Sequence, residues 1–149
     1  MALDFGFRVD SAKSLFFDRK KVIDAVDRAT RRNLSKFGAF VRRRARSSIR
    51  KRKRGVSSPG NPPFSHTGLL KNFIFFAYQP DRRSVIIGPA KLNKRGDIPH
   101  ILEFGGNQTV FNRRDNTRMR VFIQARPYMR PAFEKELEKL PSLWANSVR

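Results

Sequence analysis

The sequence predicts an α+β fold in which a long N-terminal helix and a C-terminal helix pack on a small antiparallel β-sheet. Apolar residues recur at steps of three or four through positions 18–54, which is the spacing of one helix face. Short apolar runs separated by turn residues follow between positions 71 and 124, and a second helical pattern closes the chain. Helices before and after a block of strands are typical of an α+β domain.

The composition limits the class of protein. The chain has 149 residues and is 39% hydrophobic, which suits a single domain spanning residues 1–149 with a core of its own. Its formal net charge of +21 favours polyanionic partners, although charge alone does not indicate sequence-specific recognition. The sequence contains no cysteine, so disulfides and thiolate metal sites are excluded.

The sequence carries no signal for secretion or membrane insertion. Residues 1–10 lack the long apolar run of a signal peptide, and no stretch approaches the roughly 18 consecutive apolar residues of a membrane span. We therefore expect no membrane partner. We also expect a protein that is made and kept in a cytoplasm, unless it leaves by a route other than secretion.

The long helix is expected to occupy residues 18–54. Before it, Leu3 to Val9 alternate between apolar and polar residues, which predicts a short edge strand. Asp18 is placed to act as the N-cap of the helix. At 1.5 Å per residue the helix would span roughly 50 Å, which is longer than a compact domain requires, so part of it should project. Gly38 at its middle indicates that another element approaches the helix backbone closely.

The last third of this helix is strongly basic. Between Arg42 and Arg54, nine of thirteen residues are Arg or Lys and none is acidic. Like charges four residues apart destabilise a helix, so this run should meet a counter-charge, either on nucleic acid or on an acidic protein surface. The alternative is a solvated basic face without a partner. The candidate contact residues are Arg42, Arg43, Arg44, Arg46, Arg50, Lys51, Arg52, Lys53 and Arg54.

The middle of the chain predicts a loop and a hairpin. Residues 55–65 are rich in Pro, Gly and Ser, which predicts an extended loop that cannot pair as a strand but can lie along a neighbouring subunit. Residues 67–70 open a new element that leads into an apolar run over residues 71–79. A turn at residues 80–83 and an apolar return over residues 84–88 complete an antiparallel hairpin.

The last part of the chain predicts a helical turn, two strands and a helix. Residues 98–104 should form a short helical turn that ends at Gly105. Residues 109–111 and 119–124 are expected to be strands, and residues 112–118 between them a flexible hairpin tip. The closing helix should run from residue 132 to about residue 147, with a kink or an early stop at Pro141.

Few residues suggest chemistry. His66 and His100 are the only histidines, and no catalytic or metal-binding motif is present, so we expect neither an enzyme nor a cofactor, a metal or a small-molecule substrate. Glu103 either pairs with an arginine, of this subunit or another, or is an exposed acid at a helix end. No zinc-finger, helix-turn-helix or RNA-binding signature is present. Any contact with DNA should therefore be made through phosphates.

Three stretches match one family pattern. A basic long helix is followed by a Pro-rich stretch at residues 59–63 and by Thr-Gly-Leu-Leu at residues 67–70. Glu-Phe-Gly follows at residues 103–105, and Ala-Arg-Pro-Tyr-Met-Arg-Pro-Ala at residues 125–132 precedes the last helix. Together, across about residues 18–148, they resemble the tail-completion and head-tail joining (neck) proteins of tailed bacteriophages, of the minor tail protein Z type.

The resemblance implies a structural virion protein that is assembled in the host cytoplasm. Such proteins form a homo-oligomeric ring, of six copies, at the head-proximal end of the tail, where the genomic DNA passes. The implied partners are the stopper, the tail terminator or the tail tube. The candidate subunit-interface residues are Pro59, Pro62, Pro63, Glu103, Phe104, Arg126, Tyr128 and Arg130. The alternative function is that of a small basic nucleic-acid-binding protein that contacts phosphates without sequence specificity.

Overall fold

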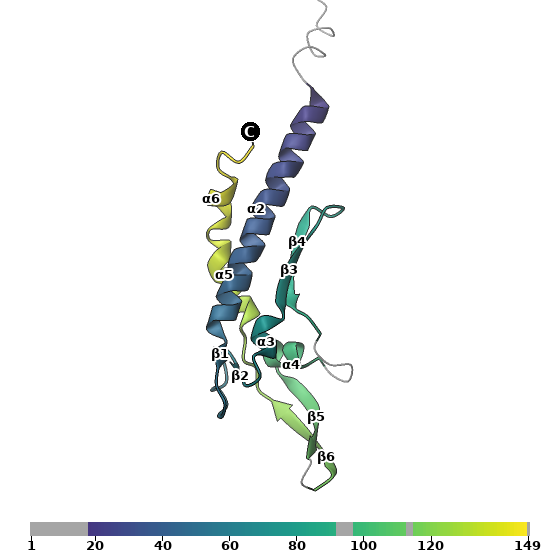
Figure 1. Ribbon diagram of the computed structural model, residues 1–149, viewed down its shortest axis with the longest axis vertical. Coiled ribbons are helices and arrows are strands. Elements are labelled where there is room, and N and C mark those ends of the chain that lie inside the picture. The colour runs from purple at the N-terminus through teal and green to yellow at the C-terminus, as the bar shows by residue number, and fades with distance from the viewer. Residues whose placement is uncertain (1–17, 92–96, 113–114, 149) are drawn as a thin grey trace, which may run out of the picture.

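The computed structural model describes residues 18–91, 97–112 and 115–148, and it confirms the α+β class (Figure 1). The edge strand expected at residues 3–9 lies outside the described residues. In chain order the elements are α2 (Arg19–Ser48), β1 (Arg50–Lys51), β2 (Phe64–Ser65), α3 (Leu69–Asn72), β3 (Ile74–Gln79), β4 (Ser84–Pro89), α4 (Ile98–Phe104), β5 (Gly106–Asn112), β6 (Thr117–Ile123), α5 (Met129–Leu137) and α6 (Leu140–Trp144).

Helix α2 is the central element. Figure 1 shows the β3–β4 hairpin along one side of it and α5 with α6 along the other. Its stripe of apolar residues therefore packs in two directions, and the buried core lies around its C-terminal half. The residues of this core cluster are Phe37, Val41, Ala45, Ile49, Leu70, Ile74, Tyr128 and Ala132.

The start of α2 was predicted correctly and its end was not. The Asp18 side chain accepts a hydrogen bond from the Lys21 backbone N–H at 3.1 Å, which is an N-cap. The helix ends at Ser48 rather than Arg54, because Ile49 turns to an extended conformation and is completely buried. The hydroxyls of Ser47 and Ser48 donate to helix carbonyls three residues back, which is a local alternative to continued helix. Ending here also removes Arg50 to Arg54 from the helix, where like charges would repel.

Within the described residues, the strands form three two-stranded sheets rather than one sheet. The parallel pair of β1 with β2 contradicts the expectation that residues 55–65 cannot pair as a strand. The expectation rested on the prolines, but the last of them is Pro63, and Phe64 and Ser65 retain the backbone N–H groups that pairing requires. The Arg52 N–H also donates to the Ser65 carbonyl at 3.3 Å, one residue beyond the ladder.

Both predicted antiparallel hairpins are confirmed, with different bounds. In β3–β4 the register pairs Ile74 with Pro89 and Gln79 with Ser84. In β5–β6 the register pairs Gly106 with Ile123 and Asn112 with Thr117, so the strands reach further into the expected tip than the sequence indicated. The flexibility expected for residues 112–118 rests partly on residues 113–114, which lie outside the described residues.

The C-terminal helix is broken, as Pro141 predicted. It begins at Met129, three residues before the expected start, and α5 ends at Leu137. A second short helix, α6, then carries Pro141 in its first turn, where the missing N–H has no helical partner to lose.

Gly38 has the close neighbour that its position predicted. A Cβ atom built on Gly38 would lie 2.9 Å from Phe76 Cδ2 and 3.0 Å from Val85 Cγ2, both on the β3–β4 hairpin. Such distances are shorter than a van der Waals contact, so the hairpin can reach α2 only because this position lacks a side chain.

We expect Gly38→Ala to lower the free energy of unfolding by about 1–2 kcal/mol. The methyl group forces Phe76 and Val85 away from α2, and this overpacking outweighs the roughly 1 kcal/mol that Ala gains in helix propensity. Urea denaturation followed by circular dichroism measures the change. Lys36→Ala, at an exposed position of the same helix, is the control and should be near neutral. A Gly38→Ala protein more stable than its parent would contradict the packing.

Candidate functional site

The basic run divides at Ser48 into a helical part and an extended part. In the helical part, Arg42 Nε donates to the Ile74 carbonyl at 2.7 Å, which ties α2 to the start of β3. Arg44 Nε donates to the Glu136 carboxylate, which ties α2 to α5. Arg43 lies 5.3 Å from the centre of the Phe40 ring, and Arg46 is half-buried. Of the predicted contact residues, Arg42 and Arg44 are therefore engaged within their own chain.

Glu136 supplies the counter-charge for the helical part. It is 4% exposed and also accepts a hydrogen bond from Lys139 at 2.9 Å. Burial opposes the charged form, but the hydrogen bonds and positive charges of Lys139 and Arg44 outweigh it and lower the pKa of the Glu136 carboxyl. The need for a counter-charge near Arg44 was predicted, and the chain itself provides one.

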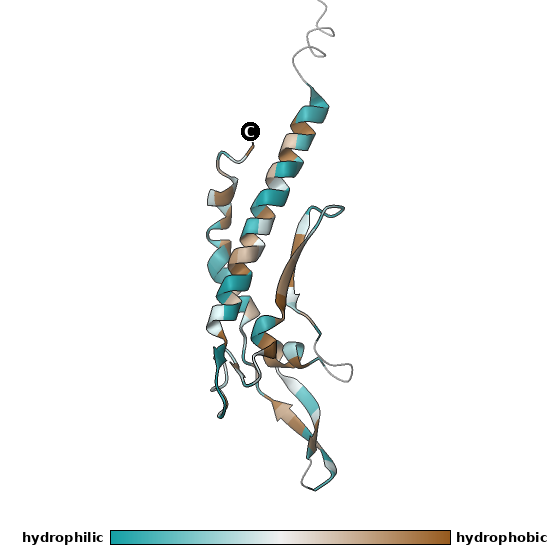
Figure 2. Cartoon of the chain, viewed as in Figure 1, coloured by the Kyte–Doolittle hydropathy of each residue, from teal (hydrophilic) through white to brown (hydrophobic). Residues whose placement is uncertain are grey.

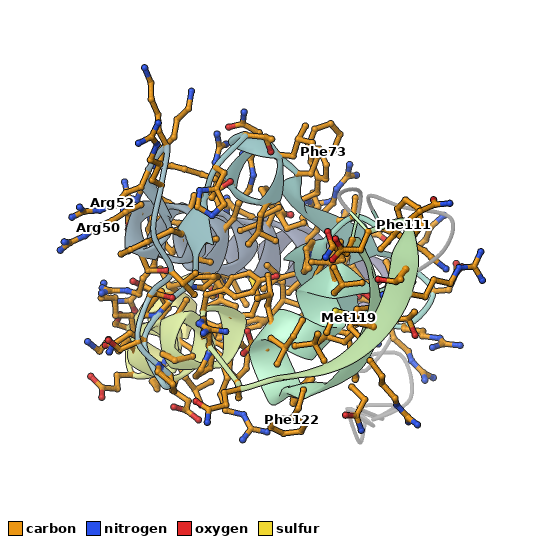
Figure 3. All side chains as sticks on the ribbon, turned by 90° about the horizontal axis from the view of Figure 1, so that it is seen from below. Arg50, Arg52, Phe73, Phe111, Met119 and Phe122 are labelled. Atoms are coloured by element: carbon orange, nitrogen blue, oxygen red, sulfur yellow. The ribbon has the colours of Figure 1, made fainter. Side chains whose placement is uncertain are left out.

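The extended part of the run is a surface segment. Arg50, Lys51, Arg52, Lys53 and Arg54 are five consecutive exposed cations, which we call the basic arm. The Arg52 guanidinium lies 5.1 Å from the centre of the Phe64 ring, and the Arg52 carbonyl lies 2.9 Å from His66 Nδ1. Figure 3 shows Arg50 and Arg52 pointing outward on the side of the molecule away from Phe111 and Met119. The basic arm is therefore the part of the run that is open to a polyanion.

Glu103 caps the N-terminus of α5. Its carboxylate accepts hydrogen bonds from the backbone N–H groups of Tyr128, Met129 and Arg130 at 2.9, 3.0 and 2.8 Å. These donors have no partner within the helix, and a carboxylate is also favoured by the helix dipole. The sequence suggested an ion pair with an arginine or an exposed acid, and the structure gives Glu103 a different role within its own chain.

The same junction holds the chain on either side of Glu103. The Arg126 backbone N–H donates to the Leu102 carbonyl at 2.6 Å. Gly105 has φ +78°, and a Cβ atom there would lie 3.2 Å from both the Ala125 nitrogen and the Ile123 carbonyl oxygen. Position 105 therefore needs glycine for its backbone conformation and for this close approach. We call the contact of residues 102–105 with residues 123–130 the helix junction.

Arg126 connects the helix junction to the Pro-rich loop. Its Nε donates to the Ser57 carbonyl at 3.0 Å and its Nη1 donates to the Gln124 carbonyl at 3.2 Å. The Gly60 N–H donates to the Ala125 carbonyl at 2.9 Å, so the loop is fastened at a second point. Arg126 was a candidate interface residue, and in this structure it serves the fold of its own chain.

The other candidate interface residues differ in their exposure. Tyr128 is 1% exposed and lies in the core, so its placement at a subunit surface was wrong. Burial, together with the nearby Glu103 and Asp97 carboxylates, raises the pKa of the Tyr128 hydroxyl. Pro63 is buried and Pro62 half-buried, whereas Pro59, Phe104 and Arg130 are exposed. These last three remain candidates for contact with a partner.

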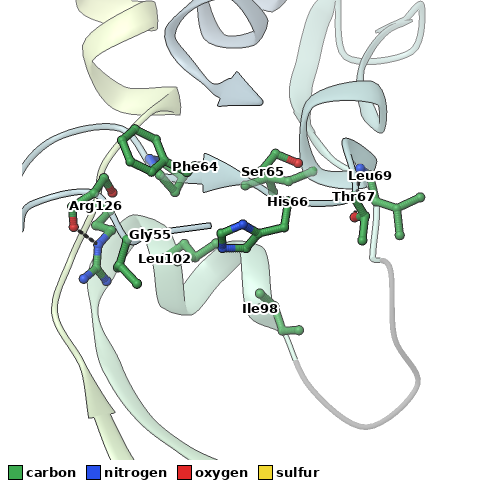
Figure 4. A pocket seen from close by; sticks show the side chains of 13 residues that line it. Gly55, Phe64, Ser65, His66, Thr67, Leu69, Ile98, Leu102 and Arg126 are labelled. Carbon is green, nitrogen blue, oxygen red and sulfur yellow. Dashed lines mark hydrogen bonds between the residues drawn. The ribbon is translucent and has the colours of Figure 1, made fainter. Parts of the chain in front are cut away.

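A cavity of about 410 Å³ lies beside the helix junction (Figure 4). Residues of the Pro-rich loop, of the step into α3 and of α4 line it, and Figure 4 shows the His66, Leu102 and Ile98 side chains around it. Its walls are mainly apolar, with Arg126 at one end. No sequence pattern indicates this cavity, because its lining comes from separate segments of the chain.

Two kinds of site are absent from the described ranges 18–91, 97–112 and 115–148. No group of three or more His, Asp or Glu side chains there is placed to hold a metal ion. None of the helices there is long and apolar enough to cross a membrane.

Comparison of the chain with protein-family models, with curated proteins and with solved structures finds no match.

We expect Glu103→Ala to lower the free energy of unfolding by about 2–4 kcal/mol, because three donors at the start of α5 lose a charged acceptor. Glu103→Gln keeps one side-chain oxygen and should cost about half as much. Glu138→Ala, at an exposed acid beside the last residue of the same helix, is the control and should change stability by no more than about 0.5 kcal/mol. Urea denaturation measures all three. Equal stability of Glu103→Ala and Glu138→Ala would contradict the cap.

Proposed function

We propose that this chain is a structural virion protein of a tailed bacteriophage. In this proposal it forms a ring at the head-proximal end of the tail, helps to join the tail to the head and surrounds the path of the DNA. The observation that carries the proposal is the helix junction. Two of the three stretches on which the family resemblance rests, residues 103–105 and 125–132, meet there through the Glu103 hydrogen bonds and the close approach at Gly105.

The meeting of these stretches strengthens the resemblance for a physical reason. Motif matches that arise by chance in separate loops have no reason to contact one another. Here the Glu of one motif caps the helix that the other motif begins, and the Gly of the first lies against the Ala of the second. The Pro-rich loop contains residues 59–63 of the remaining stretch. Arg126, from the stretch at residues 125–132, holds this loop through the Ser57 carbonyl. The matched residues thus describe one packed unit.

The shape and surface of the chain support assembly into a ring. The molecule is elongated, with the N-terminal end of α2 at one end and the β5–β6 hairpin at the other (Figure 1). Large apolar side chains are exposed along both, including Val22 and Ile23 on α2 and Phe111 and Phe122 on the hairpin, at 42–64%. Exposed apolar surfaces of this kind mark contacts with other protein. Repeated contacts between unlike surfaces form rings when the rotation between neighbours closes.

The basic arm fits a position near DNA or an acidic partner ring. Its five cations are exposed, lie in sequence and have no acidic residue among them. Contact with DNA through such a segment uses phosphates and depends on salt. The same arm also supports the second candidate function, that of a small basic protein that binds nucleic acid as a monomer without sequence specificity.

Electron microscopy of assembled particles tests the first function. We expect density for a ring at the head-proximal end of the tail in which this subunit can be traced from α2 to α6. Mass spectrometry of purified virions provides the matching biochemical measurement. A chain that is required for infection but absent from purified virions would overturn the proposal.

We expect replacement of the basic arm by glutamines to weaken binding to duplex DNA and to flatten its salt dependence. Removing one contact between a cation and a phosphate reduces the slope of log affinity against log salt by about 0.9, so removing five would reduce it by about 4 to 5. Filter binding or fluorescence anisotropy at several salt concentrations measures both effects.

The control for this experiment removes the same number of charges elsewhere. Five exposed cations of α2 are replaced by glutamine in the control protein: Arg19, Lys20, Lys21, Arg28 and Arg31. If the slope falls as much in the control as in the basic-arm variant, the net charge rather than the arm binds DNA. Submicromolar affinity of the monomeric parent at physiological salt would favour the second candidate function.

A further inference from the structure

The β3–β4 hairpin carries an apolar face that the described part of the chain leaves largely exposed. Its inner face packs on α2 through Ile74 and Phe76. The register places Phe75 opposite Gly88 and Ala77 opposite Ile86 on the other face, where Phe75 is 49% and Ile86 56% exposed. Phe73, 39% exposed, extends this face, since its ring lies edge-on to Phe75 at 6.0 Å. We call this surface the outer face. Figure 2 shows the hydrophobic character of the hairpin.

The β5–β6 hairpin, which we call the ribbon, has two chemically different faces. The register places Val110 opposite Met119 and Gln108 opposite Val121 on one face, and Ile123 lies at its base. The other face carries Phe111 opposite Arg118, Thr109 opposite Arg120 and Asn107 opposite Phe122, so cations are mixed there with two exposed phenylalanines. The first face contains no charged residue, and its Val110, Met119 and Val121 are 45%, 55% and 41% exposed. We call it the apolar face of the ribbon.

The ribbon lacks the support that such an element needs. A two-stranded hairpin is at best marginally stable in water unless a further strand or a helix covers one face. Among the described elements, α4 packs against β5, but the middle of the ribbon extends past it. The exposure of both strands means that the ribbon gains most of its stability only when something covers its apolar face.

Within the described residues, the two faces do not cover each other. Figure 1 places the β3–β4 hairpin beside α2 and the ribbon at the lower end of the molecule. The described part of the chain thus has two uncovered apolar faces on separate elements.

The charge of the chain limits where a second copy can meet it. Copies that each carry +21 repel wherever their charged surfaces meet. The apolar face of the ribbon and the outer face are composed of neutral residues. One cation lies at the outer face, since the Arg42 guanidinium is 5.9 Å from the centre of the Phe75 ring, and its Nε already donates to the Ile74 carbonyl. Contact of the two faces therefore desolvates at most this one hydrogen-bonded charge. An arrangement in which a charged face meets an apolar one would desolvate cations without compensation.

We propose that the apolar face of the ribbon in one copy packs on the outer face of the β3–β4 hairpin in the next copy. For its partner, the proposal rests on the ring of the proposed function. The contact is heterologous, since each copy contributes a different face to each of its two neighbours, and such a contact forms a ring when its repeated rotation closes. Two sheets then pack face to face, as in a sandwich.

The size of the contact indicates a weak pair and a stable ring. Six large side chains about half exposed provide on the order of 500 Å² of apolar surface, less than the roughly 1,200–2,000 Å² of a standard interface. A single contact therefore binds weakly. Ring closure gives every copy two contacts, so assembly should rise steeply with concentration, with little dimer present.

Cysteine cross-linking tests the pairing directly, because the chain has no cysteine of its own. One protein carries Val121→Cys on the ribbon and a second carries Ile86→Cys on the outer face. After mixing and mild oxidation we expect mixed dimers to exceed clearly the half that random collision gives. The control pairs Ile86→Cys with Thr109→Cys, on the charged face of the same ribbon, and should give only the random proportion.

Charge variants provide a second test, which disrupts the contact instead of capturing it. Val121→Glu disables the ribbon and Ile86→Glu disables the outer face, so each protein alone should be monomeric in sedimentation velocity. An equal mixture should give only a weakly associated dimer at high concentration and nothing larger, because the two variants together retain a single ribbon-to-outer-face contact. Thr109→Glu, which adds the same charge to the other face of the ribbon, should assemble as the parent does. Circular dichroism melting checks that each variant is folded.

Three results would overturn the proposed contact. A random proportion of mixed dimers is the first, and a folded Ile86→Glu protein that assembles like the parent is the second. The third is a parent chain that stays monomeric at high concentration, in which case another virion protein covers these faces. The proposed function has a separate test. It would be overturned by the absence of the chain from purified virions, whatever the cross-linking result. A chain present in virions without preferential cross-linking would overturn only this contact.

Discussion

The three hydrogen bonds from the backbone of residues 128–130 to the Glu103 carboxylate are the constraint on which the rest of the structure depends. They fix where α4 meets α5. From that point α5 runs back along α2, which brings Glu136 to Arg44, and Arg126 draws in the Pro-rich loop through Ser57. The ribbon leaves and returns between α4 and α5, so its base is fixed at the same place by Gly105 and Ala125. One carboxylate therefore sets the relation of elements that are far apart in sequence.

The positive charge of the chain is divided between structure and surface. Within the helical part of the basic run, Arg42 and Arg44 have acceptors in the Ile74 carbonyl and Glu136, and burial of Glu136 makes its pairing with two cations effective. The helix ends at Ser48, before the five further cations of the basic run. These five cations form the basic arm, which is exposed at the surface. The local repulsion that would make a long basic helix unfavourable is thus reduced by ending the helix at Ser48.

Local patterns in the sequence predicted which helices and strands form. They were less successful in predicting where these elements end and which elements contact one another. The N-cap at Asp18, the two antiparallel hairpins, the turn of helix ending at Gly105 and the break at Pro141 follow from residue types that act within a few positions. The end of α2 at Ser48 was missed because helical periodicity continues to Ile49, whose side chain is buried from an extended backbone. The parallel pairing of β1 with β2 was missed because it joins segments that carry no strand pattern. The roles of Glu103, Arg126 and Tyr128 depend on contacts between segments far apart in the chain, for which the sequence offers no spacing rule.

The geometry of the two uncovered hairpins bears on how a ring of this chain would close. Helix α2 spans about 45 Å over its 30 residues, and its C-terminal half is packed on both sides by β3–β4 and by α5. The ribbon is held to the same body at Gly105 and Ala125. The two faces therefore belong to elements that are both attached to the same body, the β3–β4 hairpin through α2 and the base of the ribbon through the helix junction. A heterologous contact gives a closed ring when its repeated rotation closes and an open filament when it does not. On this view the helix junction matters twice, because it stabilises the subunit and, through the ribbon, fixes the direction in which the next subunit is added.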